Sequence, residues 1–184
     1  MRIPYLILFY AIVMFIPSPS IATTMFHVSD LEQAQNSDAV VIATIGVGQT
    51  GEHPNKKSIM TETNILVEEV LAGNAPTFLT IRQMGGTLNG KTMYVPGDAR
   101  LEEGAKVILF LHEESGLWYL TAMEQSKYDL HHHPRIGWVM KRKLHGGLVV
   151  RTSDGRLAPF KPSKTKPVQT LSDFKNTLKK GGVQ

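Results

Sequence analysis

The sequence predicts a mainly β protein: an antiparallel β-barrel with a short helix before it and a β-hairpin and helix after it. A series of short segments with strand patterns follow one another at close spacing, and helical patterns occur only near the ends of the mature chain. Short strands separated by turn residues are typical of sandwiches and barrels. The chain contains no cysteine, so we expect hydrophobic packing to hold the domain without disulfides.

Residues 1–22 have the three-part layout of a secretory signal peptide. Arg2 precedes an apolar run from Tyr5 to Ile16, and a Pro/Ser segment then reaches Ser20 and Ala22. Small residues at these two positions favour cleavage between Ala22 and Thr23. An uncleaved N-terminal anchor is the alternative. We expect an exported protein, periplasmic or secreted, and an exported domain without cysteine suits a bacterial source.

The first element expected in the mature chain is a short helix. Ser29 can cap it while Glu32 reaches back, and the helix should end near Asn36. Strand patterns then occupy residues 38–47, 59–67, 77–84, 91–97, 106–112 and 117–123. The Gly/Pro-rich residues 48–58 are expected to form a polar loop.

The end of the chain has its own expected elements. A second hairpin is centred on Ser153–Gly155, and residues 161–169 are a linker. A closing helix over residues 170–180 carries Leu171, Phe174 and Leu178 along one face.

Charge divides the mature chain into two parts. Residues 23–130 contain 7 Lys/Arg and 14 Asp/Glu, a net charge of −7, whereas residues 131–184 contain 12 Lys/Arg and 2 Asp/Glu, a net charge of +10. We therefore predict an acidic barrel over residues 23–130 and a basic C-terminal extension over residues 131–184.

Three stretches carry a resemblance to a known group: "SDAVVIATI", "ILVEEVLAGNAPTFLTIRQ" and "LEEGAKVILFLHEESGLWYL". Over about residues 37–128 the chain resembles the netrin-module and tissue-inhibitor-of-metalloproteinases group of OB-fold domains. It is also similar to small secreted bacterial proteins with a Gly–Gly stretch and a V-x-G step, here Gly85–Gly86 and Val95–Gly97. The resemblance implies an OB-like barrel. It does not imply protease inhibition through a zinc-capping N-terminal cysteine, because that cysteine is absent.

The sequence shows no pattern that predicts an enzyme. A nucleophile elbow, a P-loop and an H-E-x-x-H pattern are all missing. The neighbouring carboxylates Glu68 and Glu69 should point to opposite faces of a strand, so they cannot act together on one substrate atom. The protein is therefore expected not to be an enzyme.

The run His131–His133 is a candidate metal site. In an extended segment His131 and His133 share a face with Asp129, and His145 could approach from a following strand. Together these residues could bind zinc or copper. The other interpretations are a pH-sensitive joint and a polar strand end without a ligand; the last is favoured, and no cofactor is then expected.

The basic extension is a candidate partner-binding surface, centred on Trp138, Lys141, Arg142 and Lys143. In an exported protein this cluster favours anionic lipid, an anionic envelope polymer or a protein partner, and makes nucleic acid an unlikely ligand. The alternative is that the extension lies on its own acidic barrel.

These observations predict an exported, non-enzymatic binding or accessory module that interacts with another protein. The resemblance suggests an exported protease as that partner. Metal binding through the histidines and binding of anionic polymer or lipid through the extension remain the alternatives.

Overall fold

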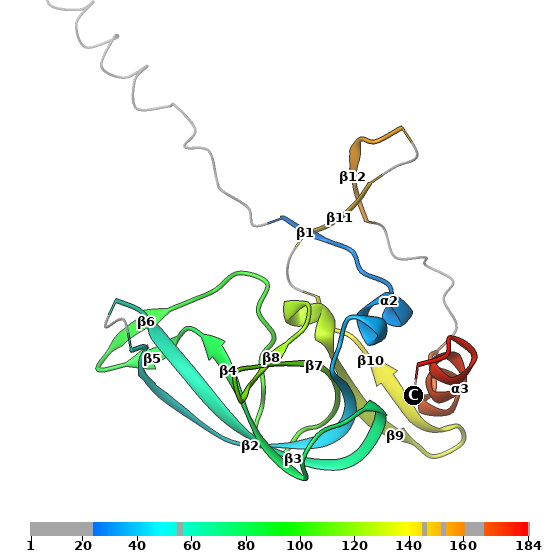
Figure 1. Cartoon of the computed structure of the whole chain (residues 1–184), viewed down its shortest axis with the longest axis horizontal. Coiled ribbons are helices and arrows are strands. Elements are labelled where there is room, and N and C mark those ends of the chain that lie inside the picture. The colour runs from blue at the N-terminus through cyan, green and yellow to red at the C-terminus, as the bar shows by residue number, and fades with distance from the viewer. Residues whose placement is uncertain (1–23, 55–56, 145–146, 152–153, 161–167, 184) are drawn as a thin grey trace, which may run out of the picture.

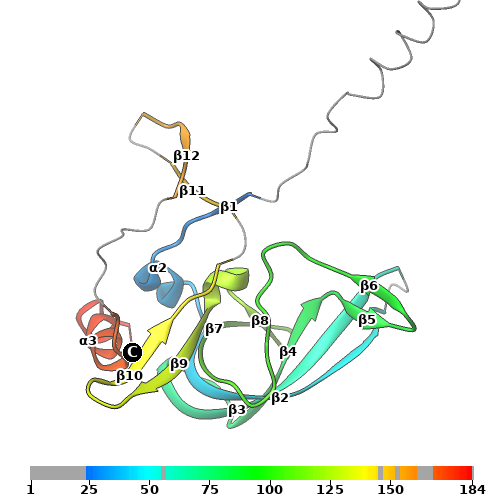
Figure 2. The ribbon, with the colours of Figure 1, turned by 180° about the vertical axis from the view of Figure 1, so that it is seen from behind.

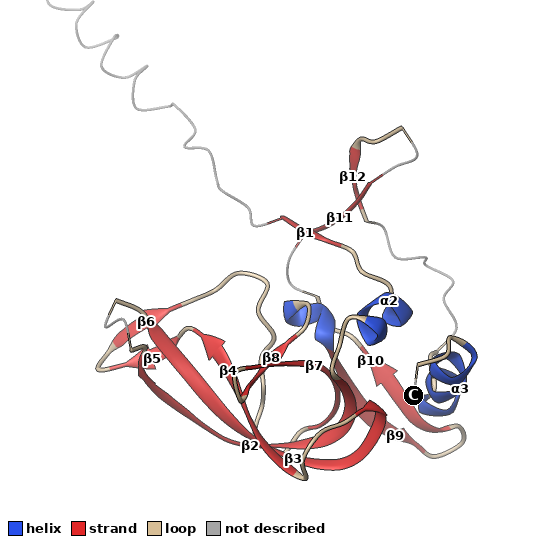
Figure 3. Ribbon diagram, in the orientation of Figure 1, coloured by secondary structure: helices blue, strands red, loops and turns tan. Residues whose placement is uncertain are grey.

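The computed structural model describes residues 24–54, 57–144, 147–151, 154–160 and 168–183, and within them the chain is mainly β (Figure 3). The predicted signal peptide and its cleavage site between Ala22 and Thr23 lie outside the described residues. The described elements are β1 Thr24–Phe26, α2 Asp30–Gln35, β2 Ala39–Glu52, β3 Ile59–Gly73, β4 Phe78–Met84, β5 Gly86–Leu88, β6 Lys91–Met93, β7 Lys106–Glu114, β8 Leu117–Leu120, the 3-10 turn η1 Met123–Ser126, β9 Lys127–His133, β10 Gly137–Lys141, β11 Gly147–Arg151, β12 Leu157–Pro159 and α3 Leu171–Lys180.

The main sheet has seven strands in the order β10-β9-β7-β2-β3-β4-β8 (Figure 1). Strand β8 also pairs antiparallel with β7, and it meets β4 in a single parallel pair, Ile81 with Trp118. Strand β2 therefore pairs with β3, β3 with β4, β4 with β8, and β8 with β7. Strand β7 in turn pairs with β2. The prediction of a mainly β, largely antiparallel fold is confirmed, while the OB-like barrel stays a prediction.

Residues 48–52 of the polar loop expected over residues 48–58 belong to strand β2, and that part of the prediction is wrong. Gly48 pairs with Thr63 and Glu52 pairs with Ile59, so β2 and β3 continue as a two-stranded arm. Between them the hydroxyls of Thr50 and Thr61 lie 3.1 Å apart within hydrogen-bonding distance. A polar composition does not prevent pairing here, because the ladder uses backbone groups and the arm need bury little apolar surface.

The predicted extension is continuous with the sheet. Strand β9 crosses the boundary that we predicted at residue 130, and β10 pairs with it in register from Gly137–His133 to Lys141–Asp129. The predicted second hairpin is present as β11 and β12, which pair antiparallel, and β1 pairs parallel with β11. This small sheet stands apart from the main sheet in both views (Figures 1 and 2).

Strands β2 and β7 are covered on both faces, which explains their continuous apolar sequences. Val40 and Phe110 point into one core cluster with the helices, and Val41 and Leu109 point into a second cluster within the ring of strands.

Both predicted helices are present. Ser29 caps α2, its hydroxyl accepting a hydrogen bond of 3.3 Å from the Glu32 N–H, and Thr170 caps α3 by accepting from the Asp173 N–H at 3.1 Å. Phe174 and Leu178 of α3 are fully or almost fully buried in the first core cluster. In the described part of the chain, no helix has the length and apolar character needed to span a bilayer.

Candidate functional site

The outward side chains of β3 and β4 form a continuous surface, here called the β3–β4 face. They meet in four cross-strand pairs, Leu66 with Phe78, Asn64 with Thr80, Glu62 with Arg82, and Met60 with Met84. The intervening residues Ile65, Leu79 and Ile81 point into the core. This alternation follows from the two-residue period of a strand, and it sets an apolar pair at each end of the face, with an uncharged polar pair and an ion pair between them.

Hydrogen bonds join the two members of each polar pair, whereas the side chains of the pair Leu66–Phe78 are exposed to solvent. The Thr80 hydroxyl donates to Asn64 Oδ1 at 3.2 Å, and Arg82 Nε donates to Glu62 Oε1 at 3.0 Å. The hydrogen bond that Arg82 donates to Glu62 raises the pKa of Arg82. Phe78 is 75% exposed and Leu66 is 41% exposed. A large aromatic side chain in this position has little contact with its own fold and can contribute its surface to a partner.

A hollow lies on each side of the outward row of β4. One, of about 380 Å³, separates Phe78 from Gly46 of β2. A Cβ on Gly46 would lie only 2.9 Å from the Asn64 carbonyl oxygen, so a glycine is required where β2 approaches β3. The other hollow, of about 480 Å³, lies between β4 and the turn that joins β7 to β8 and includes Trp118 in its wall.

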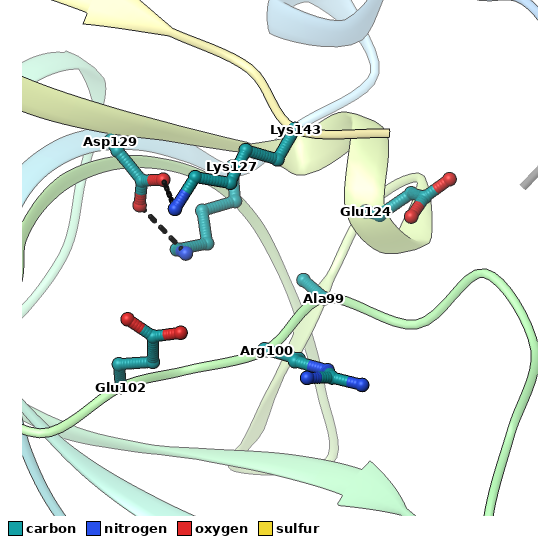
Figure 4. Close-up of a pocket in the computed structure, with 7 residues that line it drawn as sticks. All are labelled: Ala99, Arg100, Glu102, Glu124, Lys127, Asp129 and Lys143. Atoms are coloured by element: carbon teal, nitrogen blue, oxygen red, sulfur yellow. Dashed lines mark ion pairs between the residues drawn. The ribbon is translucent and has the colours of Figure 1, made fainter. Parts of the chain in front are cut away.

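A third, smaller hollow of about 110 Å³ is lined mainly by charged residues from the loop before β7, from η1 and β9, and from the segment after β10 (Figure 4). Asp129 forms two ion pairs there, one with Lys127 at 2.8 Å and one with Lys143 at 3.4 Å. Glu102 and Arg100 approach from the opposite side. Because positive and negative side chains are matched, this hollow is best described as a junction between the main sheet and the segment that follows β10.

The two carboxyls beside this junction have opposite pKa shifts. Burial opposes ionisation of Asp129, but the hydrogen bonds and charges of Lys127 and Lys143 outweigh it and hold its pKa below the ordinary value. Burial raises the pKa of Asp98, assisted by the charge of Glu124 and opposed by hydrogen bonds from Gln83 and the Ala99 N–H.

The candidate metal ligands lie on an exposed strand end. His131 and His133 are exposed on β9, and the His133 ring accepts a hydrogen bond of 3.3 Å from the Arg135 N–H. His145 lies outside the described residues. Asp129, the proposed additional ligand, is paired with two lysines. Over the described ranges, no three His, Cys, Asp or Glu side chains come together as a metal site would require.

The candidate partner-binding residues of the extension divide into two groups. Arg142 and Lys143 contact the acidic body: Arg142 pairs with Asp30 at 3.0 Å and lies 4.0 Å from the Tyr128 ring centroid, and Lys143 pairs with Asp129. Lys141 is exposed on β10, and the Trp138 ring lies 5.1 Å from the Lys106 ammonium.

The Arg142 contact is incompletely satisfied. Its Nε and one terminal nitrogen are buried without a well-aligned hydrogen bond, although the ion-pair distance to Asp30 is short. Asp30 also accepts the Tyr128 hydroxyl at 2.8 Å. The guanidinium is therefore held by charge and by the Tyr128 ring, and it is not presented to an external anion.

Sequence reasoning identified the strands that form the β3–β4 face but not the face itself. The available signal was the phase of the alternation: Phe78 is out of step with the core residues Leu79 and Ile81. An apolar residue in the outward phase indicates a surface with a role beyond packing.

Comparison with known proteins gives no relative: no family model, curated protein or solved structure matches the chain.

Proposed function

We propose that the protein is an exported, non-enzymatic interaction module built on an OB-like barrel, and that it binds another protein through the β3–β4 face. The pairing order β2-β3-β4-β8-β7, with β7 returning to β2 and a parallel step between β4 and β8, supports such a barrel. In OB folds the second and third strands, with the loop joining the fourth and fifth, form the ligand-binding side. The corresponding elements here are β3, β4 and the turn between β7 and β8.

The exposed pair Leu66–Phe78 is the observation that carries this proposal. Aromatic residues are enriched in the energetically dominant centres of protein interfaces, and charged residues are depleted there. Phe78 is the most exposed of the large apolar residues in the described chain, and hollows flank it on both sides. Such an arrangement can receive apolar side chains of a partner around a central aromatic anchor.

The contacts of the extension favour this face over the basic cluster. Arg142, Lys143 and Lys175 pair with Asp30, Asp129 and Glu69 of the body. These charges stabilise the chain's own fold, so fewer cations remain for an anionic polymer or lipid. An exported protease is one partner that this module could bind, as the resemblance suggests.

Photo-cross-linking in the secreting cell tests the proposal. A photoreactive phenylalanine analogue replaces Phe78, and the control replaces Tyr94, which is 64% exposed but lies off this face. We expect a cross-linked protein at position 78 that is absent at position 94. The purified partner should then bind Phe78→Ser about 30-fold more weakly than wild type, the loss of one interface anchor of about 2 kcal/mol. Equal cross-linking at both positions, or equal affinity, would contradict the proposal.

A further inference from the structure

The backbone of β4 has an edge that the fold leaves largely unpaired. Beyond the ends of the β3–β4 ladder, the Val67 N–H donates to the Thr77 carbonyl at 2.8 Å and the Gly85 N–H donates to the Ile59 carbonyl at 2.7 Å. Both pairs continue the register of the ladder. Because backbone groups alternate in direction along a strand, the odd-numbered residues of β4 bond towards β3 and the even-numbered residues face the opposite edge.

Strand β8 occupies that opposite edge only at its centre. The parallel contact is limited to the pair Ile81–Trp118, and no described strand pairs with Phe78 on this side. The N–H and carbonyl of Phe78 and the N–H of Thr80 therefore lie along an edge with capacity for further hydrogen bonds. An edge of this kind is a template for another strand.

The hollow of about 480 Å³ lies beside this edge. Phe78, Thr80 and Arg82 form its β4 wall, and Gly116, Leu117 and Trp118 form the facing wall. A strand added to β4 would enter the hollow with its backbone against Phe78 and Thr80. Its alternate side chains would point towards the exposed pair Leu66–Phe78 or towards Trp118.

The charge of the surface restricts the occupant. The Glu62–Arg82 pair is neutral as a unit, the Asn64–Thr80 pair is uncharged, and the remaining pairs are apolar. A segment without net charge and with apolar residues at alternate positions complements this arrangement. A nucleic acid strand or anionic polymer would find no matching positive row.

We propose that β4 binds an extended, uncharged peptide segment of another exported protein by strand addition. This inference rests on the proposed function, since it names the form in which the partner meets the β3–β4 face. Main-chain hydrogen bonds to Phe78 and Thr80 would supply affinity, and the hollows on each side would select the alternate side chains.

Selection from a phage-displayed library of random seven-residue peptides against the full mature chain tests strand addition. We expect enriched peptides with alternating apolar residues. N-methylation of the peptide at the one residue whose N–H bonds to the Phe78 carbonyl should weaken binding at least tenfold, and N-methylation at the residues on either side of it should have little effect. Failure to enrich any peptide, or equal effects at all positions, would overturn the inference.

Two variants at one position provide the matched control. Thr80→Pro removes the N–H that faces the open edge and should weaken the selected peptides at least tenfold, whereas Thr80→Val keeps that N–H, changes only the side chain in the wall of the hollow, and should weaken them much less. Equal losses in both variants would assign the effect to the side chain and contradict strand addition. If Thr80→Pro does not fold, the affinities of the N-methylated peptides for the wild-type chain still test strand addition.

The outcomes also separate this inference from the proposed function. A protein cross-linked at position 78, with binding that N-methylation does not affect, would keep the interaction face and reject strand addition. A position-78 cross-link joining two copies of this chain, with concentration-dependent dimerisation, would make β4 a self-association edge and overturn the assignment to a separate partner.

Discussion

Asp98 and Asp129 lie near the same junction, yet the fold raises the pKa of Asp98 and lowers the pKa of Asp129. Asp129 receives two lysines, and Asp98 receives neutral donors in a partly buried position. The side chains that surround a carboxyl, and not its burial alone, therefore decide which protonation state the folded chain favours.

Asp129 should make the fold sensitive to acid. Its pKa is lowered from the ordinary value of 3.8, so the folded state prefers the ionised form. Its contribution to stability is complete above that ordinary value and is lost as the pH falls through the lowered folded-state pKa. Asp129→Asn should reduce the free energy of unfolding by about 2 kcal/mol at neutral pH and by much less in strong acid. Urea unfolding across this range measures the difference; a pH-independent effect would contradict the ion-pair account.

Asp98 should show the opposite sign. Its pKa is raised from 3.8, so the folded state holds the proton more tightly and ionisation costs stability as the pH rises through the folded-state value. Asp98→Asn retains an oxygen that can accept from Gln83 and from the Ala99 N–H. The variant should melt at the same or a higher temperature than wild type at neutral pH. A lower melting temperature would show that the ionised carboxylate stabilises this loop.

At the scale of elements, α3 is an integral part of the core. The Phe174 ring is fully buried, with its centroid 5.9 Å from that of Phe110 and 6.3 Å from that of Tyr128. Lys175, the next residue, pairs with Glu69 of β3 at 2.7 Å. The helix thus closes the sheet face that carries Val40 and Phe110.

Removing the Phe174 ring should destabilise the whole domain. Phe174→Ala should lower the free energy of unfolding by about 3–5 kcal/mol, whereas Asn176→Ala on the exposed side of α3 should change it by less than about 0.5 kcal/mol. Chemical denaturation followed by circular dichroism checks both variants. Unchanged stability in Phe174→Ala would mean that α3 does not pack on the sheet in solution.

The sequence allowed the helices to be located more accurately than the long strands. Ser29 is a local capping signal, and the spacing of Phe174 and Leu178 is helical, so these elements follow from neighbouring residues alone. The β2–β3 arm was missed because Gly48 and Gly51 look like loop residues until Thr61 and Thr63 are known to lie opposite them. Strand pairing depends on residues distant in the sequence, and no local pattern specifies it.

At the scale of the molecule, the acidic body and the basic extension are joined by ion pairs. The charge asymmetry was visible in the sequence, but the pairing of Arg142 with Asp30 and of Lys143 with Asp129 required the fold. The phase of the alternation could have marked Phe78 as an outward residue, but its pairing with Leu66 depends on the β3–β4 register, which the sequence does not show. A metal site was predicted at His131–His133 because these residues are adjacent in the sequence. Among the described residues, the structure brings no further ligand to them.

The extension should therefore act as a stabilising element. Replacement of Lys141, Arg142 and Lys143 together by Gln should lower the melting temperature by several degrees, because two ion pairs are lost from partly buried positions. Salt of about 1 M should lower the wild-type melting temperature more than that of the variant, since it screens exposed charges over about 3 Å. Binding of the variant to anionic vesicles should equal that of wild type. Loss of vesicle binding with unchanged melting would restore the extension as a binding surface.

Hydrogen–deuterium exchange of residues 23–184, alone and with the protein cross-linked at position 78, is the most direct test of the proposed interaction face. We expect the partner to slow amide exchange in residues 78–82 of β4 and in residues 115–118 at the β7–β8 turn, and to leave β9, β10 and α3 unchanged. Protection confined to β10 and residues 141–144, with none in β4, would contradict the account and place the partner on the basic extension.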